Sequence, residues 1–550
     1  MTNFLKKHWL IIAILILAAF LRFYKLGSFP ALNADEASNS YDAYSLIKTG
    51  MDQHGNVWPL TFQSFNDYKP GLYVYLDLPF IKLMGLTPLA ARIPGALAGV
   101  LSVLVIYLLV IELLKNRKLA AISAFLLTIS PWAIQFSRGG WEVTVSTLFL
   151  MLGVYLFLIF LRSRNIWHLI FSICNLVFSM YMYHAPRLIV PVLGLTAILI
   201  YRKEIFVKQN TKKIITAIVF GIIIMLPLVH DLLSPGALSR EAGLGLFSDS
   251  GPINRVNEQR GEYSNPSNKI GMLLHNKIVN YSLDFAENYG SHFAGEFLFM
   301  TGDAVQRNKI PDMGEMYLFD IIFLAVGVVT LAKTFKDHKK SYLLIIAWLL
   351  VAVVPSALTF EAPSALRAQI MVIPLVIISS IGCYQIIKWI SGQKVFFRTT
   401  FYVLLSALVV WNFTRYEHMY WGHMAKEYPY SSQYGVEELA NYISQNGSNY
   451  QNIYVTNRYD QPYILFLFYL KYPPQEFQFH HVLTTKDEFG FSTVADFDKY
   501  HFGSIDFESM KNNYPNSLII GTPEEIPQSA NIVKRIYGTN GFEYFDVVQN

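Results

Sequence analysis

The sequence predicts a polytopic α-helical membrane protein with a small α/β domain at its C-terminal end. Of its 550 residues, 53% are hydrophobic and only 15% are charged, and the mean hydropathy is positive. A soluble protein of this length carries about 25% charged residues. A chain with many membrane spans is therefore the better expectation.

The spans are predicted from apolar runs that are long enough to cross a bilayer, about 17 to 25 residues each. Eleven such runs occur, some of marginal length. They lie near residues 5–24, 88–112, 119–136, 142–161, 166–184, 186–201, 213–230, 316–335, 341–359, 366–388 and 398–414. The first run follows Lys6 and Lys7 and has a poor cleavage site, so we interpret it as a retained anchor and not as a cleaved signal peptide.

The loops between these runs alternate in charge. Basic segments such as "KNRK" at 115, "RSR" at 162 and "KTFKDHKK" at 333 alternate with loops that are long or nearly free of lysine. Because cytoplasmic loops carry the excess of lysine and arginine, we expect the N-terminus in the cytoplasm and the C-terminus outside. A membrane domain of residues 1–415 would then have two large outer loops, 25–87 and 231–315.

Residues 416–550 have the composition of a soluble domain, which we expect to be extracytoplasmic. The segment "GVEELANYISQNG" at 435 is typical of an amphipathic helix, "NIYVTN" at 452 and "SLIIGT" at 517 of buried strands, and "GTNG" at 538 of a hairpin turn. The two cysteines, Cys174 and Cys383, both lie in apolar runs. We therefore expect packing residues and no disulfide.

Charged residues gather at the predicted outer rim of the membrane and are almost absent from the middle of the spans. That absence argues against an ion-coupled transporter, whose pathway needs such residues. The rim residues are Asp35, Glu36, Asp67, Lys69, Arg92, Arg138, Glu142, His184, Arg187 and Arg367. Arginines in outer loops run against the positive-inside bias, so each of them needs an explanation.

Two interpretations of the rim residues stay open. Taken singly, each arginine can extend to lipid head groups or pair with a nearby acid. Arg138 and Glu142 can form a local i,i+4 helix pair. His184 can be a histidine of the membrane interface. Taken together, the residues predict one cavity in which carboxylates activate a hydroxyl group and cations hold a phosphate.

The same residues lie in motifs that resemble a known family. The motifs are "DEA" at 35, "FNDYKPGLYVYL" at 65, "ARIPGALAG" at 91, "SPWAIQFSRGGWE" at 130 and "MYHAPRLIVP" at 182. In this order they look like the bacterial branch of the protein O-mannosyltransferase family, membrane glycosyltransferases of the GT-C fold that are related to the aminoarabinose transferases. The resemblance covers roughly residues 1–415. It implies a GT-C fold, a polyprenyl-phosphate sugar donor, a periplasm-side active site and a catalytic acid in the first outer loop.

The resemblance also implies roles for individual residues. Asp35 is expected to be the catalytic base, and Glu36 a supporting or metal-binding acid. The residues expected at the donor phosphate are Lys69, which lies in an acid-aromatic-Lys-Pro pattern, and its helpers Arg138, Arg187 and Arg367. Those expected to contact the acceptor or support the site are Asp67, Tyr68, Glu142 and His184. No cofactor is identified. A divalent metal stays open because Asp35, Glu36, Glu142 and His184 could supply ligands, although no metal-ligand spacing demands one.

The predicted function is the transfer of a sugar from a polyprenyl-phosphate donor to a hydroxyl of a protein, lipid or cell-envelope glycan. We expect one inverting displacement at the outer face of a prokaryotic plasma membrane. Because the leaving phosphate is already stable as an anion, no strong general acid is needed, unlike in a glycosidase. The partners are the donor, the acceptor and membrane lipids, with no nucleic acid.

Two alternatives to an enzyme stay open. A flippase or other transporter of lipid-linked saccharides would need a polar path and discontinuous helices near the midplane, whereas Pro131, Pro186 and Pro355 are predicted near helix ends. A non-catalytic scaffold for the outer domain would leave the rim charges unexplained.

Overall fold

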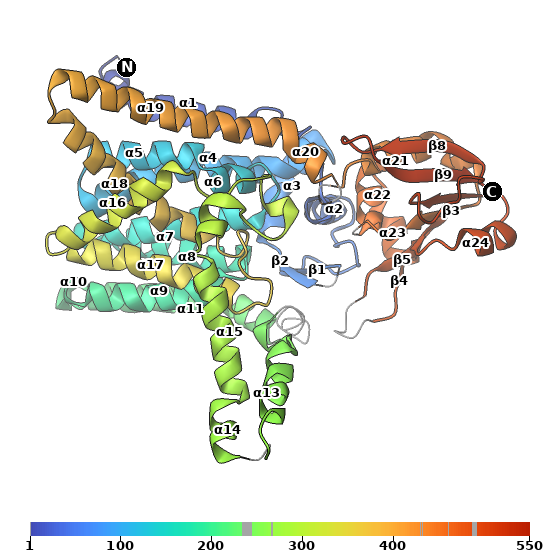
Figure 1. Cartoon of the computed structure of the whole chain (residues 1–550), viewed down its shortest axis with the longest axis horizontal. Coiled ribbons are helices and arrows are strands. Elements are labelled where there is room, and N and C mark those ends of the chain that lie inside the picture. Colours follow the sequence, from blue (N-terminus) through green and yellow to red (C-terminus); the bar gives the residue numbers. More distant parts are fainter. Residues whose placement is uncertain are drawn as a thin grey trace. The chain divides into compact units, whose positions relative to one another are not determined.

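The computed structural model describes residues 2–65, 67–233, 245–265, 268–429, 431, 433–459, 461–486 and 492–550. These residues are mostly helical, with one short hairpin and one larger sheet (Figure 1). The chain divides into two compact units. The helical unit comprises Met1–Leu21, Ala98–Phe136 and Val143–Tyr416, and the mixed unit comprises Arg22–Leu97, Ser137–Glu142 and Glu417–Asn550. The predicted division at residue 415 stays a prediction.

The helical unit is built from apolar helices at the positions of the predicted runs. They are α1 (Thr2–Phe23), α4 (Pro88–Leu114), α5 (Arg117–Ile129), α6 (Pro131–Ser137), α7 (Glu142–Ser163), α8 (Ile166–Met182), α9 (Pro186–Ile200), α11 (Thr211–Leu232), α16 (Phe319–Lys333), α17 (Lys339–Ala357), α18 (Val372–Ser391) and α19 (Val395–His418). Cys174 and Cys383 are free.

The described helices make this a multi-pass membrane protein. Six of them are long and apolar enough to cross a bilayer, or seven if the bent pair α5 and α6 is one span. Three more apolar helices are shorter, His8–Phe23, Ile166–Met182 and Pro186–Ile200. The predicted number of eleven spans therefore stays a prediction.

The bend between α5 and α6 has a local cause. Ser130 has an extended ψ of 125°, because a proline disfavours the helical conformation of the residue before it and Pro131 follows. The two helices consequently meet at 57°. The chain then passes into the mixed unit at Ser137 and returns to the helical unit after Glu142.

Shorter elements connect the apolar helices of the helical unit. They are α10 (Arg202–Ile205), η1 (Lys208–Asn210), η2 (Leu246–Ser248), α13 (Gly251–Gly261), α14 (Lys269–Leu274), α15 (Lys277–Ser291), the π-helix η3 (Glu296–Met300), η4 (Gln306–Asn308) and η5 (Gln369–Met371).

The mixed unit begins with a helix–hairpin–helix segment. Its elements are α2 (Ala34–Thr49), β1 (Thr61–Ser64), β2 (Asp67–Pro70) and α3 (Leu72–Met84). The strands β1 and β2 pair antiparallel, with Phe62 opposite Lys69. Helix α2 has few large apolar residues, yet most of its side chains are buried. Its polar groups must therefore find partners inside the protein.

The C-terminal part of the mixed unit is an α/β fold, as the sequence predicts. Its helices are the π-helix η6 (Met419–His423), α20 (Met424–Glu427), α21 (Val436–Asn446), η7 (Gly447–Asn449), α22 (Pro462–Tyr469), α23 (Pro474–His480) and α24 (Phe507–Asn513). Its strands are β3 (Asn452–Thr456), β4 (Val482–Leu483), β5 (Val494–Phe497), β6 (Tyr500–Gly503), β7 (Ser517–Gly521), β8 (Ile532–Tyr537) and β9 (Glu543–Gln549). They form one sheet in the order β4-β5-β6-β3-β7-β9-β8. Strand β3 runs parallel to both of its neighbours, and β8 and β9 form the predicted hairpin.

Helix α2 and the C-terminal fold share one hydrophobic core. Tyr41 of α2 packs in a single buried cluster with Tyr463 and Phe477, from α22 and α23. Polar contacts reinforce this packing: Gln478 Nε2 donates to Asp52 O at 2.7 Å, and Gln433 Oε1 accepts from the backbone N–H of Ala34 at 2.6 Å.

We expect Phe477→Ala to destabilise the mixed unit strongly. The Phe477 side chain is fully buried and stacks on His481, with ring centroids 4.7 Å apart. Removing a buried phenylalanine ring costs about 3 to 5 kcal/mol. Thermal unfolding of the purified variant measures the loss. Phe479→Ala is the matched control, because Phe479 lies on the same helix and is 71% exposed. Equal melting temperatures for the two variants would contradict the shared core.

Candidate functional site

The candidate site is built on the first turn of α2. Asn33 caps this helix: its side chain accepts from the backbone N–H of Glu36, and the Glu36 carboxylate accepts from the backbone N–H of Asn33. This reciprocal capping box satisfies two N–H groups that a helix start leaves without partners. It also fixes the direction in which the two adjacent acids, Asp35 and Glu36, leave the backbone.

Glu36 is the buried member of the acid pair. Its side chain is 1% exposed. The fully buried Arg92 donates two hydrogen bonds to its carboxylate, from Nε at 2.7 Å and from Nη2 at 2.8 Å. The backbone N–H of Gly140 donates to the same carboxylate at 2.7 Å. With the two contacts from Asn33, both carboxylate oxygens are occupied. This geometry favours the supporting role over the metal-binding one that the sequence also left open.

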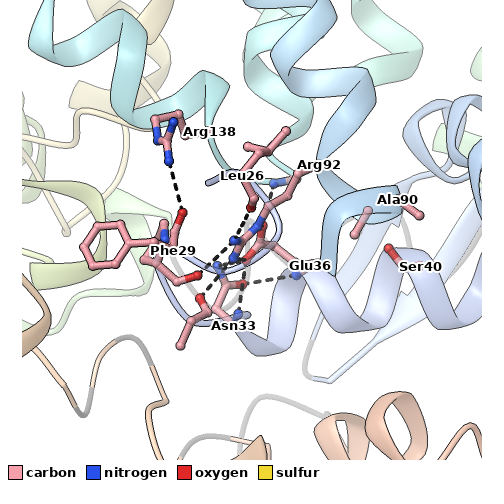
Figure 2. A network of polar contacts seen from close by, with 12 residues as sticks. Leu26, Phe29, Asn33, Glu36, Ser40, Ala90, Arg92 and Arg138 are labelled. Carbon is pink, nitrogen blue, oxygen red and sulfur yellow. Dashed lines mark hydrogen bonds and ion pairs between the residues drawn. The ribbon is translucent and has the colours of Figure 1, made fainter. Parts of the chain in front are cut away.

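Arg92 also holds the loop that precedes α2. Its Nη1 donates to the carbonyl oxygens of Leu26 and Pro30, both at 2.9 Å, and its Nη2 donates to that of Ala31 at 3.0 Å. All five guanidinium N–H groups are thus used. Figure 2 shows Arg92 between this loop and Glu36. The sequence marked Arg92 only as a charge at the rim and assigned it no role, although a lone arginine in the apolar run "ARIPGALAG" was a signal.

Asp35 and Lys69 form the accessible pair of the site. Lys69 Nζ lies 2.6 Å from Asp35 Oδ1, and their side chains are 12% and 21% exposed. Lys69 comes from β2, and its ammonium lies 5.0 Å from the centroid of the Phe65 ring. Unlike Glu36, this pair keeps contact with solvent.

A third predicted residue, Glu142, joins this pair through the polar face of α2. Spacings of i, i+3, i+4 and i+7 place side chains on one helix face. The face consists of Asp35, Ser38, Asn39 and Asp42. Asn39 Nδ2 donates to Glu142 Oε1 at 2.8 Å, and Glu142 interacts electrostatically with both Lys69 and Asp35. Asp35, Lys69 and Glu142, which are far apart in the sequence, therefore lie in one cluster.

Asp42 is a buried acid of this face that the sequence did not single out. Its carboxylate accepts from the backbone N–H of Gln53 at 3.0 Å and from the Gln53 side chain at 3.2 Å. Burial raises the pKa of Asp42 well above its ordinary value, and the nearby charge of Asp52 raises it further. Asp42 therefore stays protonated to a higher pH than an exposed aspartate. Its spacing of seven residues from Asp35 was the signal in the sequence.

Arg138 is 1% exposed and is bound into the interior of the mixed unit. Its Nε donates to the Tyr420 hydroxyl at 2.8 Å and its Nη2 to Phe29 O at 3.3 Å (Figure 2). Its guanidinium also lies 4.9 Å from the Trp421 ring centroid. Because α6 ends at Ser137 and α7 begins at Glu142, Arg138 and Glu142 do not share a helix, and the i,i+4 helix pair is not formed. These contacts favour a structural role for Arg138.

Two further predicted residues lie on β2. Tyr68 is opposite Gln63 in the hairpin, and Asp67 is opposite Ser64. The Asp67 side chain lies outside the described part of the structure.

The remaining predicted residues belong to the helical unit. Arg187 Nη1 lies 3.2 Å from His184 Nδ1, and Arg187 Nε donates to Met180 O. Arg367 forms an ion pair of 2.7 Å with Glu361. Each cation is thus engaged by a neighbour in its own unit.

The described residues contain no group of three or more His, Cys, Asp or Glu side chains that could hold a metal ion. Glu36 is committed to Arg92, and His184 has Arg187 as its neighbour. The role of a divalent metal therefore stays a sequence-based expectation.

The chain resembles known proteins in sequence and in fold. A family model described as dolichyl-phosphate-mannose-protein mannosyltransferase matches residues 69–230. No curated protein matches the sequence.

Three solved structures share the fold. The oligosaccharyltransferase of Archaeoglobus fulgidus in the apo form has a TM-score of 0.54 at 11% identity, covering 94% of this chain and 70% of that one. ArnT from Cupriavidus metallidurans bound to undecaprenyl phosphate has a TM-score of 0.55 at 12% identity, covering 98% of both chains. The archaeal oligosaccharyltransferase AglB, with an inhibitory peptide and a dolichol-phosphate, has a TM-score of 0.51 at 13% identity, covering 84% of this chain and 64% of that one.

These matches confirm the resemblance seen in the motifs: the chain has the GT-C fold and resembles, over residues 69–230, the protein O-mannosyltransferase family of membrane glycosyltransferases.

Proposed function

We propose that the protein transfers a sugar from a polyprenyl-phosphate donor to a hydroxyl acceptor at the extracytoplasmic face of a prokaryotic plasma membrane. The observation that carries this proposal is the Asp35–Lys69 pair, a carboxylate and an ammonium 2.6 Å apart that both keep contact with solvent. A base for a hydroxyl proton and a cation for a phosphate are the two groups that this reaction needs.

The reaction is a single inverting displacement. The acceptor oxygen attacks the anomeric carbon, its proton passes to the Asp35 carboxylate, and the bond between the anomeric carbon and the phosphate oxygen breaks. The electron pair of that bond leaves with polyprenyl phosphate, and the Lys69 ammonium stabilises the charge that builds there. An ammonium has three N–H donors, so Lys69 can contact Asp35 and a phosphate together.

Buried residues hold this pair in place. Glu36 and Arg92 act as positioning residues, because their ion pair ties the start of α2 to the preceding loop. Glu142 supports the site through Asn39. Roles for Arg187 and Arg367 at the donor phosphate, and for Asp67, Tyr68 and His184 near the acceptor, are proposed from the family resemblance. Arg138 is proposed as a structural residue.

The donor class is supported by what the fold neighbours bind. ArnT from Cupriavidus metallidurans is solved with undecaprenyl phosphate, and AglB from Archaeoglobus fulgidus with a dolichol-phosphate and a peptide. A lipid-linked phosphate therefore fits this fold. The acceptor is a hydroxyl of a protein, a lipid or an envelope glycan, and the mannosyl identity of the sugar follows only the family description. The alternation of basic loops supports the extracytoplasmic C-terminus.

We expect Asp35→Asn to lower turnover by about 100-fold or more, because the amide keeps the size of the side chain but cannot accept a proton. Transfer from a polyprenyl-phosphate sugar by the purified variant measures this. Asp42→Asn is the matched control on the same helix face. Burial raises the pKa of Asp42 and so favours its neutral form. In Asp42→Asn, the Gln53 side chain can turn its unpaired Oε1 towards the N–H of the new amide. Normal turnover of Asp35→Asn would refute the proposed base.

Lys69→Ala is expected to weaken binding of a polyprenyl phosphate at least about tenfold, since a charge-assisted hydrogen bond to phosphate contributes about 1.5 to 3 kcal/mol. Isothermal titration or a filter assay with the purified protein reports the affinity. Lys48→Ala, an exposed lysine at the end of α2, should bind as the parent does. Unchanged binding by Lys69→Ala removes Lys69 from the donor site.

Glu36→Gln is expected to act on stability. Removing one charge of a buried ion pair costs about 3 to 5 kcal/mol, so the melting temperature should fall and the yield of folded protein should drop. Glu258→Gln is the control, because Glu258 forms an exposed pair with Arg255 and exposed pairs contribute about 0 to 1 kcal/mol. A Glu36→Gln protein that melts normally but has no activity would make Glu36 a catalytic residue.

A further inference from the structure

One segment of the helical unit runs across the direction of the apolar helices. In Figure 1, α13 and α15 run across the direction of α9 and α17 and extend away from these helices, with α14 at the far end. We call this segment the arm and define it as residues 246–265 and 268–291. Its root is fixed to the end of α17: Leu246 N–H donates to Leu358 O at 2.8 Å, and Asn288 Nδ2 donates to Thr359 O at 3.0 Å.

The attachment of the root to the end of α17 determines at which level of the membrane the arm lies. Helix α17 is one of the candidate membrane spans and ends at Ala357. The arm therefore leaves the bundle at a membrane face. Because it runs across the spans, it extends along that face. The Tyr289 hydroxyl donates to Leu350 O at 2.9 Å, about two turns before the end of α17. The inner part of α15 thus lies at the depth of the outermost turns of a span.

The far half of the arm exposes large apolar side chains. Leu273 is 72% exposed, Ile278 80% and Leu283 61%. Helix α13, in contrast, exposes polar residues such as Asn254 and Asn257. An exposed apolar patch of this kind marks an interaction surface.

The charge of this half is positive. Between Glu262 and Asp284 the sequence contains Lys269, Lys277 and a histidine, and no acidic residue. Both lysines are exposed. Apolar side chains flanked by lysines are typical of helices that lie in a bilayer interface, where the side chains enter the acyl region and the ammonium groups meet lipid phosphates.

An open groove of about 540 Å³ extends from the root of the arm along α15 as far as Lys277. Its lining is apolar apart from one lysine and two hydroxyls, and it includes Leu246, Phe247, Lys277, Ile278, Tyr281 and Phe285. Phe247 is 73% exposed. The groove therefore continues the apolar surface of the arm and has Lys277 at its edge. A phospholipid fits this groove, with an acyl chain against the apolar lining and its phosphate near Lys277.

We propose that the arm is a lateral membrane anchor. Helix α14 and the first half of α15 insert their apolar side into the leaflet at which α17 ends, and Lys269 and Lys277 contact the phosphates of anionic phospholipids. The polar exposed side of α13 faces water. The occupant of the apolar surface is thus the bilayer and not a second protein. This proposal does not depend on the proposed enzymatic activity.

The test places an environment-sensitive fluorophore at Ile278→Cys or, as the matched control, at Asn257→Cys. The background is the full chain with Cys174→Ser and Cys383→Ser, reconstituted at one copy per nanodisc. We expect the label at 278 to emit at shorter wavelength and to be quenched several-fold more by doxyl-labelled lipids than by aqueous iodide. The label at 257 should show the opposite preference. A label at 278 that is as accessible to iodide as the label at 257 overturns the proposal.

Two further measurements separate the lipid from other occupants. Lys269→Glu with Lys277→Glu should reduce lipid quenching at 278 several-fold in discs that contain phosphatidylglycerol, and much less in discs of phosphatidylcholine alone. An equal reduction in both kinds of disc overturns the role of anionic head groups. Protection of the label at 278 only in discs that hold two copies of the chain also overturns the proposal, because the apolar surface would then be an interface between copies.

Discussion

The contact between Glu36 and Arg92 organises the candidate site. A buried carboxylate and a buried guanidinium each cost several kcal/mol to remove from water, and only complete hydrogen bonding offsets that cost. Here Arg92 uses every N–H group and Glu36 uses both oxygens. The pair therefore fixes three parts of the chain at once: the start of α2, the loop before it and the turn at Gly140.

That constraint gives two adjacent acids different surroundings. Consecutive residues of a helix point about 100° apart, so when Glu36 is turned into the interior, Asp35 must point elsewhere. Asp35 consequently meets Lys69 near solvent. The inner ion pair is buried, whereas the outer pair keeps contact with solvent. One dipeptide thus supplies one buried, fully hydrogen-bonded acid and one acid that keeps contact with solvent.

Hydropathy was enough to predict where the apolar helices lie, and short apolar runs were enough to predict the buried strands β3 and β7, because these patterns are local. Among the site residues, Asp35, Lys69 and Glu142 were predicted together and lie together. The role of Arg92 and the packing of α23 on α2 were missed, because both depend on contacts between residues far apart in the chain. The expected contact of Arg138 with the donor phosphate stays a prediction. Its hydrogen bond to the Tyr420 hydroxyl was missed, because the two residues are 282 positions apart.

The cap that Gln433 places on α2 has a consequence for how the protein is made. Ala34 and Gln433 are 399 residues apart, which corresponds to roughly 20 to 80 s of synthesis. During that interval the backbone N–H of Ala34 lacks the partner that it has in the folded protein. A nascent chain therefore carries Asp35 on an incompletely capped helix. The cap on this turn is complete only when the segment that contains Gln433 has left the ribosome and folded against it.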